Sequence, residues 1–307
     1  MGDRCSTTGR QSAATSVRVR RPTVHLREQE AVSGPSNSIL LVGESGVGKT
    51  HYGAQLLRRL MRVKGALRMN GAATNLEAFE TALESLDEGR AAGHTARTVN
   101  VDSVWPVIDS GGRQANLVWP EYGGEQIKSV LENRRLPDAW QKRVDGADAW
   151  LLLVRLQQAI VGDDMFSKPL AALKGASVEN REVHQSDQAR LVELLQMLLF
   201  SYGSGTKAQR IPRLGVLLTC WDETATAQTP AEVLSTSLPL VSAFVRSNWC
   251  QPLIMGLSAL ERPLSPTTRD MDYASKGPEH FGYVIEANGT KSTDLTLPIH
   301  HLLDTGS

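Results

Sequence analysis

Short apolar runs and amphipathic stretches alternate along most of this chain. Apolar runs of the kind found in buried strands cover residues 38–42, 149–154, 214–220 and 252–257. Apolar residues alternate or cluster, as they do in strands, over residues 98–104 and 116–119. Apolar residues at helical spacing predict helices over residues 49–62, 76–86, 186–202 and 231–247. Strands that alternate with helices in this way predict an α/β fold, in which helices cover both faces of a mostly parallel sheet.

The rest of the chain divides into a tail, an insertion and an extension. Residues 1–37 are rich in Ser, Thr, Gly and Arg, so we expect a disordered basic tail that buries too little surface to fold. We expect residues 38–307 to form a single domain with an irregular insertion near 155–185. A C-terminal extension over 262–307 contains a short apolar strand and a short helix, and we expect it to pack on the sheet edge.

The first predicted strand leads into Gly43-Glu44-Ser45-Gly46-Val47-Gly48-Lys49-Thr50. A strand before this sequence and a helix after it are the context that a phosphate-binding P-loop requires. The glycines let backbone N–H groups surround an anion, Lys49 can reach the β- and γ-phosphates, and the Thr50 hydroxyl can bind Mg²⁺. The alternative is a glycine-rich turn with an incidental lysine. The pattern favours a P-loop NTPase, a three-layer sandwich with helices on both faces of the sheet.

Composition narrows the classes of partner. The 33 basic and 33 acidic residues cancel, so no net charge attracts nucleic acid or an anionic membrane. No apolar segment is long enough to cross a bilayer. The three cysteines are too few and too scattered for a disulfide framework or a zinc site. We therefore expect a cytoplasmic protein that binds neither nucleic acid nor membrane.

A P-loop alone does not show which nucleotide is bound, so the residues at the ends of the later strands have to indicate it. After residues 116–119, Glu121 can hold the water shell of Mg²⁺, and the N–H of Gly124 can meet a γ-phosphate. After the predicted strand 214–220, Asp222 can accept two hydrogen bonds from the edge of guanine, which adenine cannot offer. After the last core strand, a backbone N–H near Ser258 and Ala259 can donate to the guanine O6.

Each of these signals has an ordinary explanation when it is taken singly. A glutamate near glycines is common in turns, Asp222 can cap a short helical turn, and Ser-Ala is a common pair. Their order is more specific. A P-loop, loop threonines, E-x-x-G, T-x-x-D and S-A-L, each after its own strand, resemble the motif layout of Ras-like, translation-factor-class GTPases. The string W-P-E-Y-G-G-E, the Trp221-Asp222 pair and the late Phe281-Gly282-Tyr283 segment resemble the bacterial double-GTPase families associated with conflict and defence systems.

The resemblance, which covers residues 38 to about 290, implies a role for each motif. It assigns the phosphates to Gly43, Glu44, Ser45, Gly46, Val47, Gly48 and Lys49. It assigns Mg²⁺ to Thr50, to Glu121 and to a loop threonine, Thr95 or Thr98, and the guanosine to Thr219, Asp222, Ser258 and Ala259. The residues that serve the reacting phosphate would be Lys49, Thr98, Gly124 and Glu125.

Three positions depart from the pattern of the resembled families. Glu121 stands where an aspartate is usual, and its side chain is one methylene longer. Cys220 stands where a lysine stem usually packs on the guanine face, which leaves base selectivity to Asp222. Glu125 stands where a glutamine often orients the attacking water, and its negative charge disfavours close approach to a triphosphate.

These observations predict a GTP-binding switch protein that uses Mg²⁺ and hydrolyses bound GTP slowly to GDP. Arg90 and Arg97 would lie in its first switch segment and are candidates for an internal arginine finger. The resemblance implies a protein partner, either a second GTPase or an effector, in a bacterial defence or conflict system. Two alternatives stay open: a nucleotide-binding interaction module that has lost hydrolysis, and a P-loop ATPase or kinase.

Overall fold

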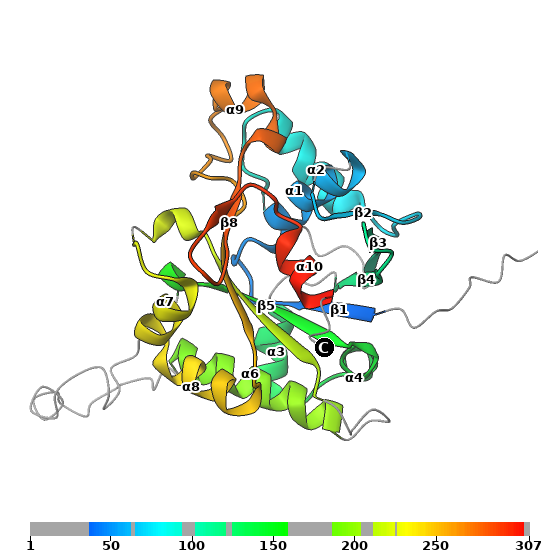
Figure 1. The fold of residues 1–307 in the computed structure, drawn as a ribbon, viewed down its shortest axis with the longest axis vertical. Helices are drawn as coiled ribbons and strands as arrows, with labels where there is room; N and C mark the ends of the chain where they lie inside the picture. The colour runs from blue at the N-terminus through cyan, green and yellow to red at the C-terminus, as the bar shows by residue number, and fades with distance from the viewer. Residues whose placement is uncertain are drawn as a thin grey trace, which may run out of the picture. The chain divides into compact units, whose positions relative to one another are not determined.

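A nine-stranded sheet with the order β2-β3-β4-β1-β5-β6-β7-β8-β9 forms the centre of the described chain (Figure 1). The computed structural model describes residues 37–62, 65–93, 102–120, 125–158, 186–203, 211–224 and 226–303. The strands are β1 (Asn37–Val42), β2 (Leu67–Met69), β3 (Ser103–Asp109), β4 (Gln114–Trp119), β5 (Ala149–Arg155), β6 (Arg213–Thr219), β7 (Leu253–Ser258), β8 (Tyr283–Ile285) and β9 (Lys291–Ser292).

The middle of this sheet is parallel and its two sides are antiparallel. Strands β4, β1, β5, β6 and β7 pair in parallel. Strands β3 and β2 extend one side, and β8 and β9 extend the other, all in antiparallel pairing. The predicted α/β fold with a mostly parallel sheet is confirmed. In such a sheet the carboxyl ends of β1, β5, β6 and β7 meet at one edge, where the loops that carry the predicted motifs begin.

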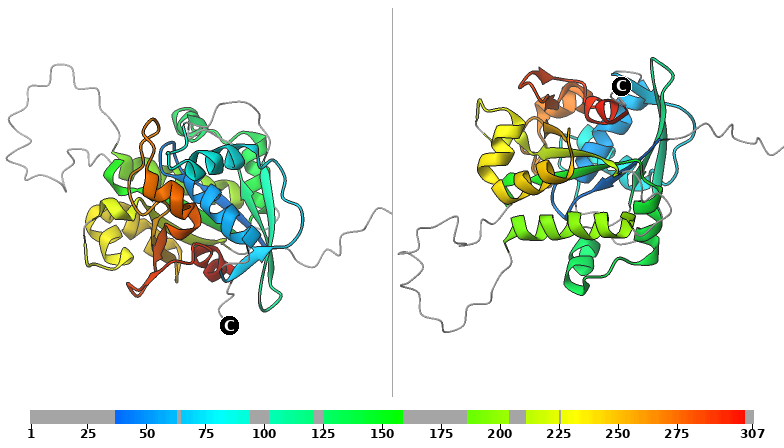
Figure 2. Two further views of the ribbon diagram at one scale, coloured as in Figure 1. Left: turned by 90° about the horizontal axis from the view of Figure 1, so that it is seen from above. Right: turned by 60° about the horizontal axis from the view of Figure 1, so that its bottom comes forward.

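Helices cover both faces of the sheet (Figure 2). They are α1 (Lys49–Arg62), α2 (Glu77–Asp87), α3 (Glu125–Asn133), α4 (Asp138–Gly146), α6 (Asp187–Gly203), α7 (Pro230–Ser237), α8 (Pro239–Asn248), α9 (Met271–Lys276) and α10 (Leu297–Leu303). Alternate residues of β1 enter different cores. Ile39 and Leu41 pack with α1 and α10, whereas Leu40 and Val42 pack with α3, α4, α6 and α8. Both faces of the central strands are therefore buried.

The helix predicted over residues 231–247 is two helices in the structure, so that prediction was wrong. Helix α7 ends at Ser237 and α8 begins at Pro239. Proline has no N–H to continue the helix, and it disfavours helical backbone at the residue before it. Leu238 accordingly leaves the helical region, with φ −132° and ψ 63°.

The strand predicted over residues 98–104 lies later in the chain. Residues 94–101 are outside the described residues, and β3 begins at Ser103. Pro106 hides this strand from sequence analysis, because proline is rare inside sheets. The Pro106 carbonyl accepts a hydrogen bond from the Asn70 N–H at 2.8 Å, just after β2 ends. Since the N and O of one strand residue point to the same side, the missing N–H faces the end of β2 and costs no bond to β4.

The C-terminal extension adds to the sheet at its edge, as predicted, and also to one face. Strand β8 pairs with β7, and β9 pairs with β8. Helix α10 packs on the same face as α1, through Ile299 and Leu302. Strand β2 and helices α3, α4 and α9 were not predicted from the sequence, because each is short. Residues 1–36 of the predicted tail, 1–37, and residues 159–185 of the predicted insertion lie outside the described residues. Asn37, the last residue of the predicted tail, begins β1, and Arg155, at the start of the predicted insertion, ends β5.

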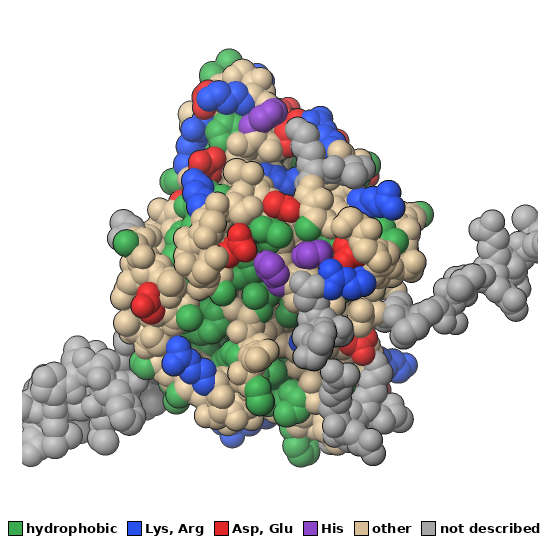
Figure 3. Space-filling view, viewed as in Figure 1, with side chains coloured by type: hydrophobic (Ala, Val, Ile, Leu, Met, Phe, Trp, Pro, Cys, Tyr) green, Lys and Arg blue, Asp and Glu red, His purple; other side chains and the backbone are tan. Residues whose placement is uncertain are grey.

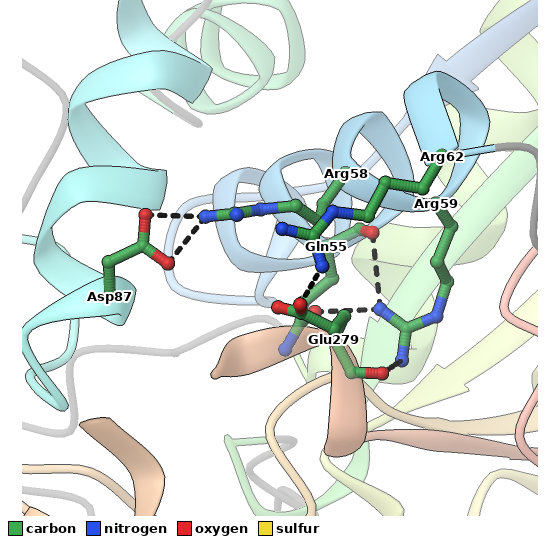
Figure 4. A network of polar contacts seen from close by, with 6 residues as sticks. All are labelled: Gln55, Arg58, Arg59, Arg62, Asp87 and Glu279. Atoms are coloured by element: carbon green, nitrogen blue, oxygen red, sulfur yellow. Dashed lines mark hydrogen bonds and ion pairs between the residues drawn. The ribbon is translucent and has the colours of Figure 1, made fainter. Parts of the chain in front are cut away.

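A polar network joins α1 to this extension, and Figure 4 shows the part of it in which Arg59 and Arg62 bind Glu279. The Arg59 guanidinium donates to the Phe281 carbonyl at 2.6 Å and to the Gln55 side-chain oxygen at 2.7 Å. The Gln55 amide donates in turn to the Tyr273 hydroxyl at 2.7 Å. Burial lowers the pKa of Arg59 to about 10, so Arg59 stays charged at neutral pH and needs these partners. The network fixes the helix that follows the P-loop against the segment that leads into β8.

Basic and acidic side chains are mixed on the face shown in Figure 3, and no large patch of one sign stands out there. Among the described residues, no helix is both long and apolar enough to span a membrane.

Substitution of Gly53 by alanine should destabilise the protein, although alanine normally favours a helix. A Cβ at Gly53 in α1 would lie 2.2 Å from Cε1 of Phe79, whose ring is held against Trp105 and Trp119 at centroid distances of 4.9 and 5.2 Å. We expect Gly53→Ala to lower the free energy of unfolding by about 1–3 kcal/mol. Urea denaturation followed by circular dichroism measures this change.

The matched control is Gly146→Ala at the end of α4, where an added Cβ meets no atom within 4 Å. This substitution should leave the free energy of unfolding unchanged or raise it by up to about 1 kcal/mol. Equal effects of the two substitutions would show that α1 and α2 do not pack as closely as described.

Candidate functional site

The P-loop connects β1 to α1 and has the backbone that an anion cradle needs. Gly46 and Gly48 have φ of 78° and 86°, a region that L side chains rarely adopt. A Cβ at Gly43 would lie 3.0 Å from Cγ2 of Val47 and 3.1 Å from the Leu153 carbonyl oxygen. Glycine at these positions lets the loop turn tightly against β5 and leaves its N–H groups at the start of α1.

Lys49 lies across this loop. Its Nζ donates to the Gly43 carbonyl at 2.7 Å and also to the Glu44 carbonyl. Burial lowers the pKa of Lys49 to about 8, and the Glu44 carboxylate opposes that shift. The ammonium is thus removed from water and bonded to neutral carbonyls. A triphosphate would supply the negative charge that this position lacks.

Glu44, the second residue of the loop, is held from α6. Arg190 donates to both carboxylate oxygens of Glu44, at 2.8 and 2.6 Å, and pairs with Asp187 at 2.7 Å. This two-bond contact directs the Glu44 carboxylate toward α6 and neutralises it. The loop therefore presents Lys49 to an anion with little opposition from Glu44.

The segment that would form the first switch leaves from a fixed root. Asp270 donates its N–H to the Gly89 carbonyl at 2.8 Å, and Ala92 donates its N–H to Nε2 of His51 at 3.1 Å. Burial lowers the pKa of His51, so the neutral ring can accept that bond. His51 follows Thr50 in the first turn of α1. The chain thus runs past the start of the P-loop helix before residues 94–101, which lie outside the described residues.

The predicted base-reading residues come together at the ends of β6 and β7. The Ser258 hydroxyl donates to Oδ1 of Asp222 at 2.5 Å and accepts from the Glu261 N–H at 2.9 Å. Asp222 lies inside the short helical turn Trp221–Glu223, whose N-cap is Cys220. The alternative role for Asp222 as the cap of this turn is therefore wrong. Thr219 is buried, and its hydroxyl has no hydrogen-bond partner among the described residues.

The C-terminal extension covers the turn after β7. Gly282 has φ of 95°, and a Cβ there would lie 2.6 Å from the Ala259 carbonyl oxygen. Tyr283, the next residue, pairs with Ser258. On the Tyr283 ring lies Nζ of Lys291, 3.8 Å from the centroid. The Phe281-Gly282-Tyr283 segment noted in the sequence thus packs directly on the predicted guanine site.

Arg155 is a residue of this site that sequence analysis missed. It ends β5, where it is paired with Thr219 of β6. Its guanidinium donates to both carboxylate oxygens of Glu223, and its Nη1 donates to the Gly46 carbonyl at 3.4 Å. This single side chain joins the P-loop to the turn that carries Asp222. A charged residue at the end of an apolar strand was the signal available in the sequence.

Cys220 lies beside this arginine. Its backbone is left-handed, with φ of 53°, and burial raises the pKa of its thiol to about 11. The thiol is therefore neutral at physiological pH.

Several predicted residues fall outside the described chain. Thr95, Thr98, Glu121 and Gly124 cannot be placed relative to the P-loop, and Glu125 is described only as the first residue of α3. Arg90, a candidate arginine finger, pairs with Glu88, whereas Arg97 is outside the described residues. Within the described residues, no group of three or more His, Cys, Asp or Glu side chains is arranged to hold a metal ion. The magnesium ligands thus stay a prediction.

Comparisons with known proteins give one family match and several similar solved structures. A model of the Double-GTPase 1 family matches residues 40–302. The comparison with curated proteins returns no match. The chain is similar to a bacterial selenocysteine-specific elongation factor, EF-Sec, at 12% identity and a TM-score of 0.34, over 73% of this chain and 26% of that chain. It is also similar to the signal recognition particle receptor SRb-GTP/SRX complex from Chaetomium thermophilum, at 14% identity and a TM-score of 0.34, over 76% and 95%.

The match to EF-Sec spans only 26% of that longer chain. The family match, in contrast, spans most of the 307 residues, from β1 to α10, and includes every motif described above. The chain belongs to the Double-GTPase 1 family, a family of P-loop GTP-binding proteins.

Proposed function

We propose that this protein is a GTP-binding switch that hydrolyses GTP slowly to GDP with the help of Mg²⁺. The observation that carries the proposal is the position of Asp222. Its carboxylate is bonded to Ser258 at the end of the neighbouring strand, and Arg155 links its turn to the P-loop. This position supports a single site in which Asp222 reads guanine and the P-loop holds the phosphates.

At the phosphate end, the chain supplies charge and backbone donors. Lys49 would exchange its carbonyl partners for the β- and γ-phosphates, and the N–H groups of the loop would surround them. The Thr50 hydroxyl, in the first turn of α1, would hold Mg²⁺ together with Thr98 and Glu121. The ion, when bound, neutralises charge that develops on the transferred phosphoryl group.

At the base end, Asp222 discriminates guanine from adenine. A carboxylate can accept from both N1–H and the exocyclic amine of guanine, whereas adenine offers no such pair of donors. Ser258 fixes one carboxylate oxygen, so the group is oriented before the base arrives. This argument favours GTP over the alternative of an ATPase or kinase.

The positions of two chain segments, residues 94–101 and 121–124, support a switch role. Residues 94–101 start from the root near His51, and residues 121–124 connect β4 to α3. In a GTPase switch, contacts with the γ-phosphate and Mg²⁺ order such segments, and hydrolysis releases them. A protein partner, a second GTPase or an effector in a bacterial defence or conflict system, would read these segments. The balanced overall charge favours a protein partner over nucleic acid.

Purified protein should bind GTP and GDP with Mg²⁺ at least about 100-fold more tightly than ATP, because adenine leaves Asp222 unpaired. Single-turnover hydrolysis of bound GTP should be slow, on the order of 10⁻⁴ to 10⁻² per second. Calorimetric titration and chromatography of the product measure the two quantities. ATP binding equal to GTP binding would overturn the proposal. If bound GTP is hydrolysed no faster than GTP in buffer, the protein is instead a nucleotide-binding interaction module that has lost hydrolysis.

The Asp222→Asn substitution should exchange base preference. Asparagine offers one acceptor and one donor, so GTP affinity should fall about 100-fold while xanthosine triphosphate affinity rises above that of the unmodified protein. Competition between the two nucleotides measures the change. Asp222→Ala is the control, since it should weaken GTP binding without any gain for the xanthine nucleotide. A loss of binding for both nucleotides in Asp222→Asn would mean that Asp222 does not read the base.

GTP affinity should decrease as pH rises above about 8. In the nucleotide-free protein the pKa of Lys49 is about 8, and triphosphate would raise it, so binding takes up a proton between the two pKa values. We expect about half a proton per nucleotide at pH 8 and an affinity about tenfold lower at pH 9 than at pH 7. Calorimetry in buffers of different ionisation enthalpy measures the uptake. Binding at pH 8 without proton uptake would refute the role of Lys49.

A further inference from the structure

The guanine site lacks one wall. The lysine that usually lies on the face of the base is replaced by Cys220, whose side chain is short and neutral. Asp222 can grip the edge of a base, but an edge contact alone does not fix the plane of the ring. A site that holds the guanine ring in a fixed plane therefore needs another side chain that packs against the face of the ring.

Arg155 lies where such a side chain is needed. It is at the end of β5, and this strand pairs with both β1 and β6, which lead to the P-loop and to the base-reading turn. Its guanidinium contacts the Gly46 carbonyl of the P-loop on one side and the carboxylate of Glu223, next to Asp222, on the other. The side chain is 28% exposed, so part of it faces solvent from this position.

The contacts of Arg155 also fix the plane of its guanidinium. Nε and Nη2 both donate to Glu223, and this two-bond fork leaves the flat group without freedom to rotate. A planar cation held in this way stacks on an aromatic ring at a small cost in entropy. Other described cations near the site have partners of their own: Lys49 binds the carbonyls of Gly43 and Glu44. Arg190 binds Glu44 and Asp187, and Lys291 lies on Tyr283.

We propose that Arg155 forms the missing wall of the base site, with its guanidinium plane against the face of the guanine ring between the P-loop and Asp222. This proposal rests on the proposed function, because it concerns the base of the same nucleotide. Arg155 then determines how tightly any purine is held, whereas Asp222 determines which purine is held. The stem that Cys220 lacks is thus supplied by the neighbouring strand.

The experiment compares Arg155→Ala with the unmodified protein and with Arg134→Ala. Arg134 is a matched control, since it pairs with Glu193 of α6 at 2.8 Å and makes no hydrogen bond or ion pair with a described motif residue. Arg155→Ala should raise the dissociation constants for GTP and GDP about tenfold. Its affinity for inorganic tripolyphosphate, which has no base, should stay within about twofold, and Arg134→Ala should change neither.

A second substitution separates stacking from a structural role. Cys220→Lys in the Arg155→Ala protein puts a lysine back where the resembled families have one. The left-handed backbone at this position already carries a non-glycine residue, so a lysine can be accommodated there. We expect this change to restore most of the GTP affinity. Because residue 220 caps the turn that carries Glu223, the introduced lysine could also pair with Glu223. A gain for GTP without a gain for tripolyphosphate would support stacking on the base, whereas equal gains for both ligands would overturn it. Thermal unfolding of each variant verifies that it is folded.

The outcomes are distinct. Failure of the unmodified protein to bind GTP would reject the proposed function itself. GTP binding that survives Arg155→Ala unchanged would reject only the role of Arg155. Equal losses for GTP and tripolyphosphate would place Arg155 on the phosphates, and a loss of hydrolysis with unchanged binding would make it an arginine finger; both results would overturn the proposal.

Discussion

The parallel pairing of β1 with β5, and of β5 with β6 and β7, is the constraint on which the site depends. Parallel strands end at the same edge of the sheet, so residues more than 100 positions apart in the chain, such as Gly46 and Arg155, become neighbours there. Register then determines which side chains meet. Arg155 is level with Thr219, and Thr219 is level with Leu257, so the turns that carry Asp222 and Ser258 begin side by side. A slip by one residue would turn each of these side chains to the other face.

The C-terminal extension stabilises this edge from outside the parallel sheet. The Phe281 carbonyl binds Arg59 of α1, and Gly282 packs against Ala259. Asp270, earlier in the extension, binds Gly89 at the root of the first proposed switch segment. Three parts of the site that are distant in sequence are thus held by one segment. Because the Arg59 charge is buried, loss of the Phe281 carbonyl would remove a hydrogen bond that offsets its desolvation, so the extension and α1 are expected to remain docked as a unit.

Much of the fold could be predicted, because long apolar strands and amphipathic helices have clear periods. The P-loop could be placed at once, since its glycines and lysine lie together in the sequence. Arg155 could not, because its role depends on the register of β5 against β6 and on a bond to Gly46 more than 100 residues away. The prediction of one helix over 231–247 was wrong because Pro239 divides it in two. The helical spacing of the apolar residues continues across this proline and hid the break. Short elements such as β2 depend on pairing with β3 and carry little pattern of their own.

Charge around the P-loop explains how the loop can hold its conformation and still favour an anion. Lys49 is desolvated, and its partners Gly43 and Glu44 offer only neutral carbonyls. Hydrogen bonds from an ammonium to phosphate are stronger than those to a carbonyl, so exchange of partners is favourable when a triphosphate arrives. The carboxylate of Glu44 would oppose that exchange if it turned inward. Arg190 prevents this with two bonds from α6, so the anion preference of the loop depends on a residue that lies 146 positions later in the chain. A movement of α6 that broke this ion pair would release a negative charge beside the phosphates, and it would weaken nucleotide binding without touching the nucleotide.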